Sequence, residues 1–342
     1  MKTETSRMKV FKKRETVLVT GGSGYVGSLL VLRLKNIGYR VINLDTMWFG
    51  NVDHRTKNIT DIRGDIRDAD LLRRLMKGVD YVINLACLSN DPSATLKPSL
   101  TKEINLNAFE PMVKIAKASG VKRFINASSS SVYGVKNINR VTEDLRPDPL
   151  TDYSRYKLET ERILQHYNSA DFVTTSIRCA TVCGYSLRQR FDVIVNLFVS
   201  QAIVKKEINV QNRKLLRPNV YIGDVVEMYA KLLKIDTNKI TGQVFNFGHS
   251  NHAIGYLAEL VAKTVPLIIK IKNNPTVTSD GRSYHISSDK IEKIGIRAKV
   301  PLKSAIKDLA VMFSLEKFDN ALTNPKYHNI KMMQQLIGTG TL

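Results

Sequence analysis

Residues 16–27 read TVLVTGGSGYVG, a short run of apolar and β-branched residues followed by glycines at three-residue intervals. The pattern predicts a buried strand over 16–20, a tight turn, and a helix that continues beyond it. Gly21, Gly24 and Gly27 let the backbone bend sharply and pack closely. They also let a phosphate approach the first turn of the helix, where unpaired N–H groups and the helix dipole favour an anion. The stretch therefore predicts a dinucleotide-binding turn.

An acidic residue completes this prediction. Asp45 lies 18 residues beyond Gly27, at the end of a second predicted strand, RVINLD (40–45). A carboxylate there can accept hydrogen bonds from the ribose hydroxyls of an adenosine, and it would repel a 2′-phosphate. The predicted cofactor is therefore NAD and not NADP.

Short apolar runs alternate with amphipathic stretches as far as residue 180. Such alternation indicates βαβ units, and it predicts an α/β fold with a Rossmann-like, doubly wound parallel sheet. Beyond that point the alternation becomes less regular. The predicted strands cover 16–20, 40–45, 59–65, 80–86, 122–129, 172–178, 207–211 and 244–248. The predicted helices after the first cover 69–77, 99–119, 152–168, 191–205, 224–234, 253–263 and 303–315.

Four regions follow from this pattern. Residues 1–14 hold six Lys/Arg and one Glu, which predicts a disordered basic arm. Residues 15–180, together with parts of 215–250, form the predicted NAD-binding Rossmann domain. Residues 181–315 form a smaller mixed α/β substrate-binding region, and 316–342, rich in Asn, Lys and Gln, is expected to be a loosely packed C-terminal tail.

Composition limits the class of protein. The 342 residues are 43% hydrophobic and 24% charged, as in ordinary globular chains. No run of 18 uncharged apolar residues occurs, and the N-terminus has no apolar signal region, so no membrane span and a cytoplasmic location are expected. Three cysteines predict neither a disulfide framework nor a metal site. The net charge of +21 would attract a polyanion, but no basic run is interleaved with aromatics, so nucleic acid is not an expected partner.

Tyr153 and Lys157 form a YxxxK motif at the start of a predicted helix. Residues four apart lie on one helix face. The pKa of a tyrosine is ordinarily near 10, and a neighbouring ammonium would lower it. The phenolate could then take a proton from a substrate hydroxyl while a hydride leaves for NAD. Upstream, ASSSSVYG (127–134) ends the fifth predicted strand.

The GxxGxxG spacing, the YxxxK motif and the ASSSSVYG segment resemble those of the extended branch of the short-chain dehydrogenase/reductase family, over roughly residues 15–312. The resemblance implies an NAD-dependent enzyme of the nucleotide-sugar epimerase/dehydratase type. It also implies a homodimer that pairs through the helices predicted at 99–119 and 152–168.

The resemblance extends the set of cofactor residues. Asp65, at the end of the third predicted strand, matches the family's acid that caps the adenine amino group, with Ile66 beside it. The run Asn84-Leu85-Ala86 matches a segment that passes along the cofactor. The implied cofactor-binding residues are Gly21, Gly24, Tyr25, Val26, Gly27, Asp45, Asp65, Ile66, Leu85, Ala86, Tyr153 and Lys157.

The resemblance also assigns the remaining catalytic roles. The residue four before Tyr133 is Ser129, which matches the Ser or Thr that holds the reacting hydroxyl, and Ser130 follows it. Asn105, in EINLNA, matches a helix Asn that supports a proton relay. The implied catalytic residues are Tyr153, Lys157, Ser129 and Asn105, and Ser129 and Ser130 are also implied to bind substrate.

Segments of the second half resemble those that bind a nucleotide-diphosphate sugar. Residues 178–198 resemble the segment that folds over this substrate, and they contain Arg190 and Asn196. LLRPNVYIGDVV (215–226) and SDGRSYHISSDKI (279–291) match segments whose arginines, here Arg217 and Arg282, bind the diphosphate. Guanidinium groups suit a diphosphate because they form charge-assisted bidentate hydrogen bonds.

Departures from the family pattern narrow the reaction. Sugar 4,6-dehydratases carry Asp-Glu after the active-site Thr, where this chain has Ser130 and Ser131. Dehydration is therefore disfavoured, and so is 3,5-epimerisation, which uses a Cys at the position of Ser131. The first hypothesis is a nucleotide-sugar 4-epimerase or related C4 oxidoreductase that acts through a 4-keto sugar in surface polysaccharide or glycan precursor synthesis. Open alternatives are a 4-dehydrogenase/4-ketoreductase, a 4,6-dehydratase, and a non-catalytic NAD sensor or RNA-binding Rossmann protein.

Overall fold

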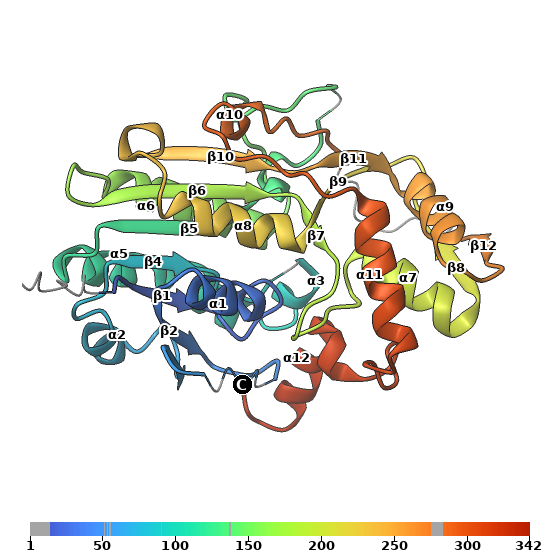
Figure 1. Cartoon of the computed structure of the whole chain (residues 1–342), viewed down its shortest axis with the longest axis horizontal. Coiled ribbons are helices and arrows are strands. Elements are labelled where there is room, and N and C mark those ends of the chain that lie inside the picture. The colour runs from blue at the N-terminus through green and yellow to red at the C-terminus, as the bar shows by residue number, and fades with distance from the viewer. Residues whose placement is uncertain are drawn as a thin grey trace, which may run out of the picture.

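The computed structural model describes residues 14–342 apart from 51, 53, 55, 90, 137 and 275–282. The chain folds around a seven-stranded sheet in the order β10-β6-β5-β4-β1-β2-β3, and all of its strand pairs are parallel (Figure 1). The strand order reverses direction between β1 and β4, which leaves a crevice at the carboxyl edge of the sheet. The strands are β1 (Thr16–Thr20), β2 (Arg40–Asp45), β3 (Ile59–Arg63), β4 (Tyr81–Asn84), β5 (Arg123–Ser129), β6 (Val173–Cys179) and β10 (Gln243–Phe247).

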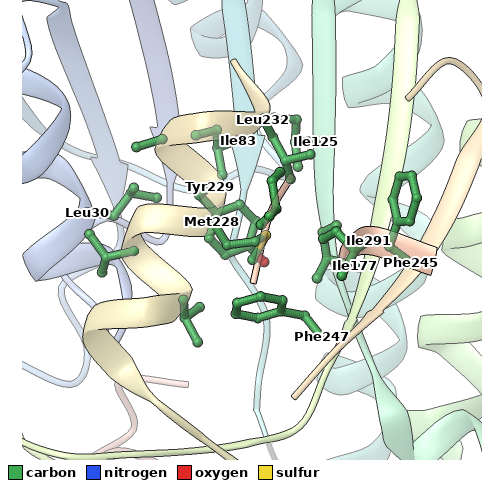
Figure 2. Close-up of a cluster of buried hydrophobic side chains, with 14 of the residues drawn as sticks. Leu30, Ile83, Ile125, Ile177, Met228, Tyr229, Leu232, Phe245, Phe247 and Ile291 are labelled. Carbon is green, nitrogen blue, oxygen red and sulfur yellow. The ribbon is translucent and has the colours of Figure 1, made fainter. Parts of the chain in front are cut away.

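Helices cover both faces of this sheet, which confirms the predicted doubly wound α/β fold. Successive strand residues face opposite sides, so Val17 of β1 packs beneath α1 and α8 while Leu18 packs toward α2 and α5. Figure 2 shows the first of these two cores, which contains Leu30, Met228 and Ile83. The covering helices are α1 (Gly27–Asn36), α2 (Ala69–Leu75), α5 (Phe109–Ala118), α6 (Asp152–His166) and α8 (Ile222–Leu232).

The start of α6 is fixed by a reciprocal cap. The Oγ1 of Thr151 accepts a hydrogen bond from the N–H of Ser154, and the Ser154 Oγ accepts one from the N–H of Thr151. This capping box places Tyr153 in the first turn and Lys157 one turn later on the same face.

A smaller mixed region covers the carboxyl edge of the large sheet. It holds the three-stranded sheet β11-β9-β7 and the pair β12-β8, packed against α7, α9 and α11 around a third apolar core (Figure 1). Its elements are β7 (Thr181–Cys183), α7 (Ile194–Lys205), β8 (Glu207–Val210), β9 (Leu216–Tyr221), β11 (Ser250–Ala253), α9 (Ile254–Thr264), β12 (Lys270–Asn273) and α11 (Leu302–Ser314). Shorter elements are α3 (Asp91–Ala94), α4 (Pro98–Lys102), α10 (Asp289–Glu292), the π-helical turn η1 (Glu103–Asn107) and the 3₁₀ turns η2 (Ser130–Tyr133) and η3 (Thr237–Lys239).

The C-terminal residues 316–342 differ from the loosely packed tail that the sequence predicts. They form η4 (Pro325–Tyr327) and α12 (Asn329–Gly338). Phe318 and Tyr327 pack on Phe191, with ring centroids 5.0 and 5.2 Å apart from it. The side chain of Met333 is fully buried in the core on the α2 and α5 side. The prediction was wrong because the apolar residues of this segment find their partners far away in the chain. Within the described residues, no helix is long and apolar enough to cross a membrane.

Candidate active site at the carboxyl edge of the sheet

One large cavity, of about 730 Å³, opens where the carboxyl edge of the sheet meets the smaller region. It brings together most of the residues that the sequence predicts to act, from both halves of the chain. These are Gly21, Gly24, Tyr25, Val26, Gly27, Asp45, Asp65, Ile66, Leu85, Ala86, Ser129, Ser130, Tyr153, Lys157, Arg190 and Arg217.

The glycine-rich turn leaves room that a side chain would fill. Gly21 has a φ of +74°, and a Cβ on it would lie 2.7 Å from the backbone nitrogen of Ala86. A Cβ on Gly27 would overlap the carbonyl oxygen of Gly21. The turn therefore has the close strand-to-helix packing and open backbone N–H groups of a pyrophosphate cradle, and it fits a dinucleotide.

The carboxylate of Asp45 is positioned by two backbone amides. Its Oδ2 accepts from the N–H of Ser23 at 3.0 Å, and its Oδ1 accepts from the N–H of Met47 at 2.8 Å. Burial raises the pKa of Asp45, although these hydrogen bonds and the charge of Arg188 act in the opposite direction. The group lies on the cavity wall, where it could accept hydrogen bonds from ribose hydroxyls.

Asp65 also lines the cavity, but its carboxylate is already engaged. The Arg67 side chain donates to both of its oxygens, with an Nη2–Oδ2 distance of 2.8 Å and an Nε–Oδ1 distance of 3.1 Å. A further bond joins Arg67 to Glu103. The ion pair with Arg67 therefore competes with the predicted hydrogen bond between Asp65 and an adenine amino group.

Three of the four predicted catalytic residues, Tyr153, Lys157 and Ser129, lie on the cavity wall. The Nζ of Lys157 is 5.9 Å from the centre of the Tyr153 ring, and it donates to the carbonyl oxygen of Ala127 at 2.6 Å. The Oγ of Ser129 accepts from the N–H and the hydroxyl of Ser131, at 3.1 and 2.9 Å. The hydrogen of the Ser129 hydroxyl can therefore be donated to a substrate oxygen.

Two predicted site residues lie behind the cavity wall. The side chain of Asn105 exchanges two hydrogen bonds with the backbone of Leu88, at 2.8 and 3.0 Å, and it does not line the cavity. Asn196 is fully buried; it accepts from the N–H of Gly184 and donates to the hydroxyl of Tyr25. Both amides brace loops that carry cavity residues, since each has its polar atoms occupied by the protein. Arg282 lies outside the described residues.

The cavity also contains polar residues that the sequence did not single out. Gln201 projects from α7 with the same spacing as Ile194 and Leu197, three and four residues apart along one helix face. Asn209 lines the cavity between Ile208 and Val210, which are buried in the core, as strand alternation requires. The helix spacing of Gln201 and the strand alternation around Asn209 were the sequence signals that could have identified these two residues. Further lining residues are Gln211, Asn212, Arg188, Tyr284 and Asn329.

Comparison with known proteins shows the family to which a chain with this fold and cavity belongs. The family model of the NAD dependent epimerase/dehydratase family matches residues 17–248, more than half of the chain. The chain belongs to this family. The predicted resemblance to extended short-chain dehydrogenases is thereby confirmed.

Relatives of this family with different activities match about equally well. A putative UDP-glucose 4-epimerase of Methanocaldococcus jannaschii is 27% identical over 305 residues, which cover 85% of this chain and 96% of the relative. The dTDP-D-glucose 4,6-dehydratase of Mus musculus is 26% identical over 320 residues, covering 87% of each chain. The structure of Thermus thermophilus UDP-glucose 4-epimerase in complex with NAD superposes with a TM-score of 0.78 at 25% identity, over 87% of this chain and 99% of that one. The family is therefore established, while the reaction is not fixed by likeness alone.

Proposed function

We propose that the protein is an NAD-dependent nucleotide-sugar 4-epimerase or a closely related C4 oxidoreductase. The observation that carries this proposal is the placement of Tyr153, Lys157 and Ser129 on one cavity wall, together with the glycine turn and Asp45. The proposed substrate is a nucleotide-diphosphate sugar, and the proposed location is the cytoplasm.

The proton chemistry follows from these three side chains. Ser129 donates a hydrogen bond to the reacting C4 oxygen and orients it. Tyr153 takes the proton of that hydroxyl, and the positive charge of Lys157, 5.9 Å from the ring centre, stabilises the phenolate that does so. NAD, held by the glycine-rich turn and Asp45, would supply the acceptor and donor of the C4 hydride. The resulting 4-keto sugar is either reduced again on its other face or released.

The acids of the cavity argue against dehydration. Elimination of water across C5 and C6 requires an acid and a base beside the sugar. Among the described lining residues, the carboxylates are Asp45, Asp65 and Asp192, and each accepts hydrogen bonds from the protein. Ser130, where dehydratases have an acid, contacts the hydroxyl of Tyr284 at 3.4 Å.

The proposed substrate end of the cavity is rich in amides. Gln201, Asn209 and Gln211 offer donors and acceptors to a nucleotide base, and Arg217 on β9 offers a cation to a diphosphate. The structure of the Thermotoga maritima UDP-glucose 4-epimerase contains UDP-glucose, and it shares the fold with a TM-score of 0.80. The amides therefore make UDP-sugars the first substrates to test.

The proposed reaction is tested by mass spectrometry of the protein incubated with UDP-, GDP-, CDP- and dTDP-sugars, with NADH absorbance followed in parallel. A product of unchanged mass and altered retention time, with no net NADH, is the result expected for an epimerase. Loss of two mass units with NADH build-up identifies a 4-dehydrogenase. Loss of water contradicts the argument from the missing acid pair, and no conversion of any sugar contradicts the proposed enzyme class.

Cofactor affinity is expected to depend on pH through Asp45. Ribose hydroxyls donate to the ionised carboxylate, so binding favours the ionised form over the protonated form that burial promotes. NAD affinity should be full above the raised pKa and should fall as the pH decreases through it, with proton uptake by Asp45 opposing binding. Calorimetric titration with NAD from about pH 8 to about pH 4.5 measures this dependence.

The matched control for this titration is Asp45→Asn, which removes the titrating group and keeps a ribose acceptor. The variant should bind NAD more weakly at neutral pH and should lose the acidic fall in affinity. An equal slope in both proteins would assign the pH dependence to another group.

We also propose a homodimer through α5 and α6, which contact each other on one side of the sheet. Light scattering should give twice the 38.5 kDa mass of the chain. A mass of 38.5 kDa at every concentration would rule the dimer out.

A further inference from the structure

Two arginines of the cavity wall are buried, and each has a nitrogen donor that makes no hydrogen bond within the described residues. Arg188 is 6% exposed and Arg190 is 8% exposed, and both line the cavity. The Nε of Arg188 and the Nη2 of Arg190 are buried and make no hydrogen bond within the described part of the chain. Leaving a buried cationic donor unpaired is costly, so these atoms indicate that an acceptor is missing from the cavity.

The C-terminal helix holds both guanidinium groups in place. Asn329, the first residue of α12, accepts from the Arg188 Nη2 at 2.6 Å and donates to the Ser89 Oγ at 2.9 Å. Asp192 accepts from the Arg190 Nε at 2.8 Å and from the N–H of Asn329 at 2.9 Å. The network joins three separate segments of the fold, so it fixes the direction of the two cations.

Two carboxylates lie near these two guanidinium groups. Asp192 accepts a hydrogen bond from Arg190, while Asp45 acts on Arg188 through its charge. Burial and the neighbouring charge of Arg190 lower the pKa of Arg188 to about 9. Two buried guanidinium groups that repel each other favour an anionic ligand between them.

The loop that carries Arg188 and Arg190 is hydrogen-bonded to the glycine-rich turn. Tyr25 donates from its hydroxyl to the carbonyl of Gly184 at 2.7 Å, and Ser186 donates to the carbonyl of Tyr25 at 2.6 Å. Arg188 lies with its guanidinium carbon 4.9 Å from the ring centre of Phe49, just beyond the Asp45 that ends β2. The loop that carries both arginines is thus bound directly to the glycine-rich turn, at which a pyrophosphate would bind.

We propose that Arg188 and Arg190, positioned by Asn329 of α12, form a second wall that binds the pyrophosphate of the dinucleotide in addition to the glycine-rich turn. This inference rests on the proposed cofactor. A pyrophosphate offers the acceptors that the two unpaired nitrogens lack, and guanidinium groups bind it through charge-assisted hydrogen bonds. The C-terminal segment would then retain the cofactor, which a catalyst that returns its hydride in each cycle requires.

The diphosphate of the substrate has the same chemistry, so the test separates the two sources. Calorimetry on the full chain uses ADP-ribose, adenosine and UDP as probes. Arg188→Gln is expected to weaken ADP-ribose binding by about 10- to 100-fold and to leave adenosine and UDP binding unchanged. The matched control is Arg162→Gln, which removes the same charge from an exposed position on α6 and should alter none of the three affinities.

A second variant tests the positioning role. Asn329→Ala keeps both cations and the backbone bond to Asp192, and it removes the side-chain bonds of Asn329 to Arg188 and Ser89. It should weaken ADP-ribose binding by about 3- to 10-fold and accelerate cofactor release, again without an effect on adenosine. This difference between the probes is one that a general loss of structure would not produce, and thermal unfolding of each variant without ligand checks its folding.

Each other outcome overturns the inference in a distinct way. If the folded variants bind ADP-ribose as tightly as the wild type, the two arginines do not bind the pyrophosphate. The proposed function is not affected by that result. Weakened UDP binding in place of weakened ADP-ribose binding assigns the arginines to the substrate. A wild-type protein that binds neither NAD nor ADP-ribose overturns the proposed function and this inference with it.

Discussion

Replacement of Tyr153 with Phe is expected to lower turnover by about 10³-fold, the central value for the removal of a general acid–base group. The change deletes one oxygen from a side chain on the cavity wall and leaves Lys157 bonded to Ala127. Nucleotide-sugar and NAD affinities should stay within about threefold, because the oxygen acts on the proton that moves in the transition state. Turnover is measured on the sugar that the substrate panel identifies, and affinities are measured by calorimetry.

Tyr156→Phe is the matched control for this prediction. Tyr156 lies on the same helix, three residues further along, and it is absent from the residues that line the cavity. The same chemical change there should leave turnover within about twofold. Undiminished turnover in the Tyr153 variant would remove this tyrosine from the mechanism. An unchanged biological effect of that variant would favour the non-catalytic NAD sensor.

Replacement of Glu161 with Ala is expected to lower the free energy of unfolding by about 3–5 kcal/mol. Glu161 of α6 and Arg178 of β6 are both buried, with an Nη2–Oε2 distance of 2.7 Å and an Nε–Oε1 distance of 3.0 Å. Ser128 donates to the same carboxylate, and the Tyr133 hydroxyl accepts from the Arg178 Nη1 at 2.8 Å. Removal of the carboxylate leaves a buried guanidinium uncompensated, which is what makes the loss large.

Chemical denaturation measures this loss, and two further variants define its cause. Glu159→Ala removes an exposed carboxylate from the same helix, where it pairs with Arg162 at 3.1 Å, and should change stability by less than about 0.5 kcal/mol. The double variant Glu161→Leu, Arg178→Met should recover most of the stability, because no charge is then left buried. A loss below about 1 kcal/mol in Glu161→Ala would show that water or another group compensates Arg178.

The ion pair between Glu161 and Arg178 also connects stability to the proposed active site. Ser128 precedes Ser129 at the end of β5, and Glu161 lies one turn beyond Lys157 on α6. Its hydrogen bond to Ser128 therefore ties the strand that carries Ser129 to the helix that carries Tyr153 and Lys157. A destabilised variant that remains folded should lose turnover as well, since both groups depend on this junction.

The sequence alone determined the parts of this protein whose geometry is local. A strand followed by GGSGYVG specifies a turn that requires glycine, as the φ of Gly21 and the overlap at Gly27 show. Tyr153 and Lys157 share a face because residues four apart do so in any α-helix. Alternation of strands with helices sufficed to predict the parallel sheet.

Only the tertiary structure decided which side chains reach the cavity. Asn105 and Asn196 match family positions, yet their amides brace loops behind the wall, and Gln201 and Asn209 face the cavity without a motif to mark them. Arg188 and Asn329 are 141 residues apart in sequence and 2.6 Å apart in space. Such contacts depend on how three apolar cores pack against one another, and no local pattern of residues records that packing, so the C-terminal segment could be placed only by the folded chain.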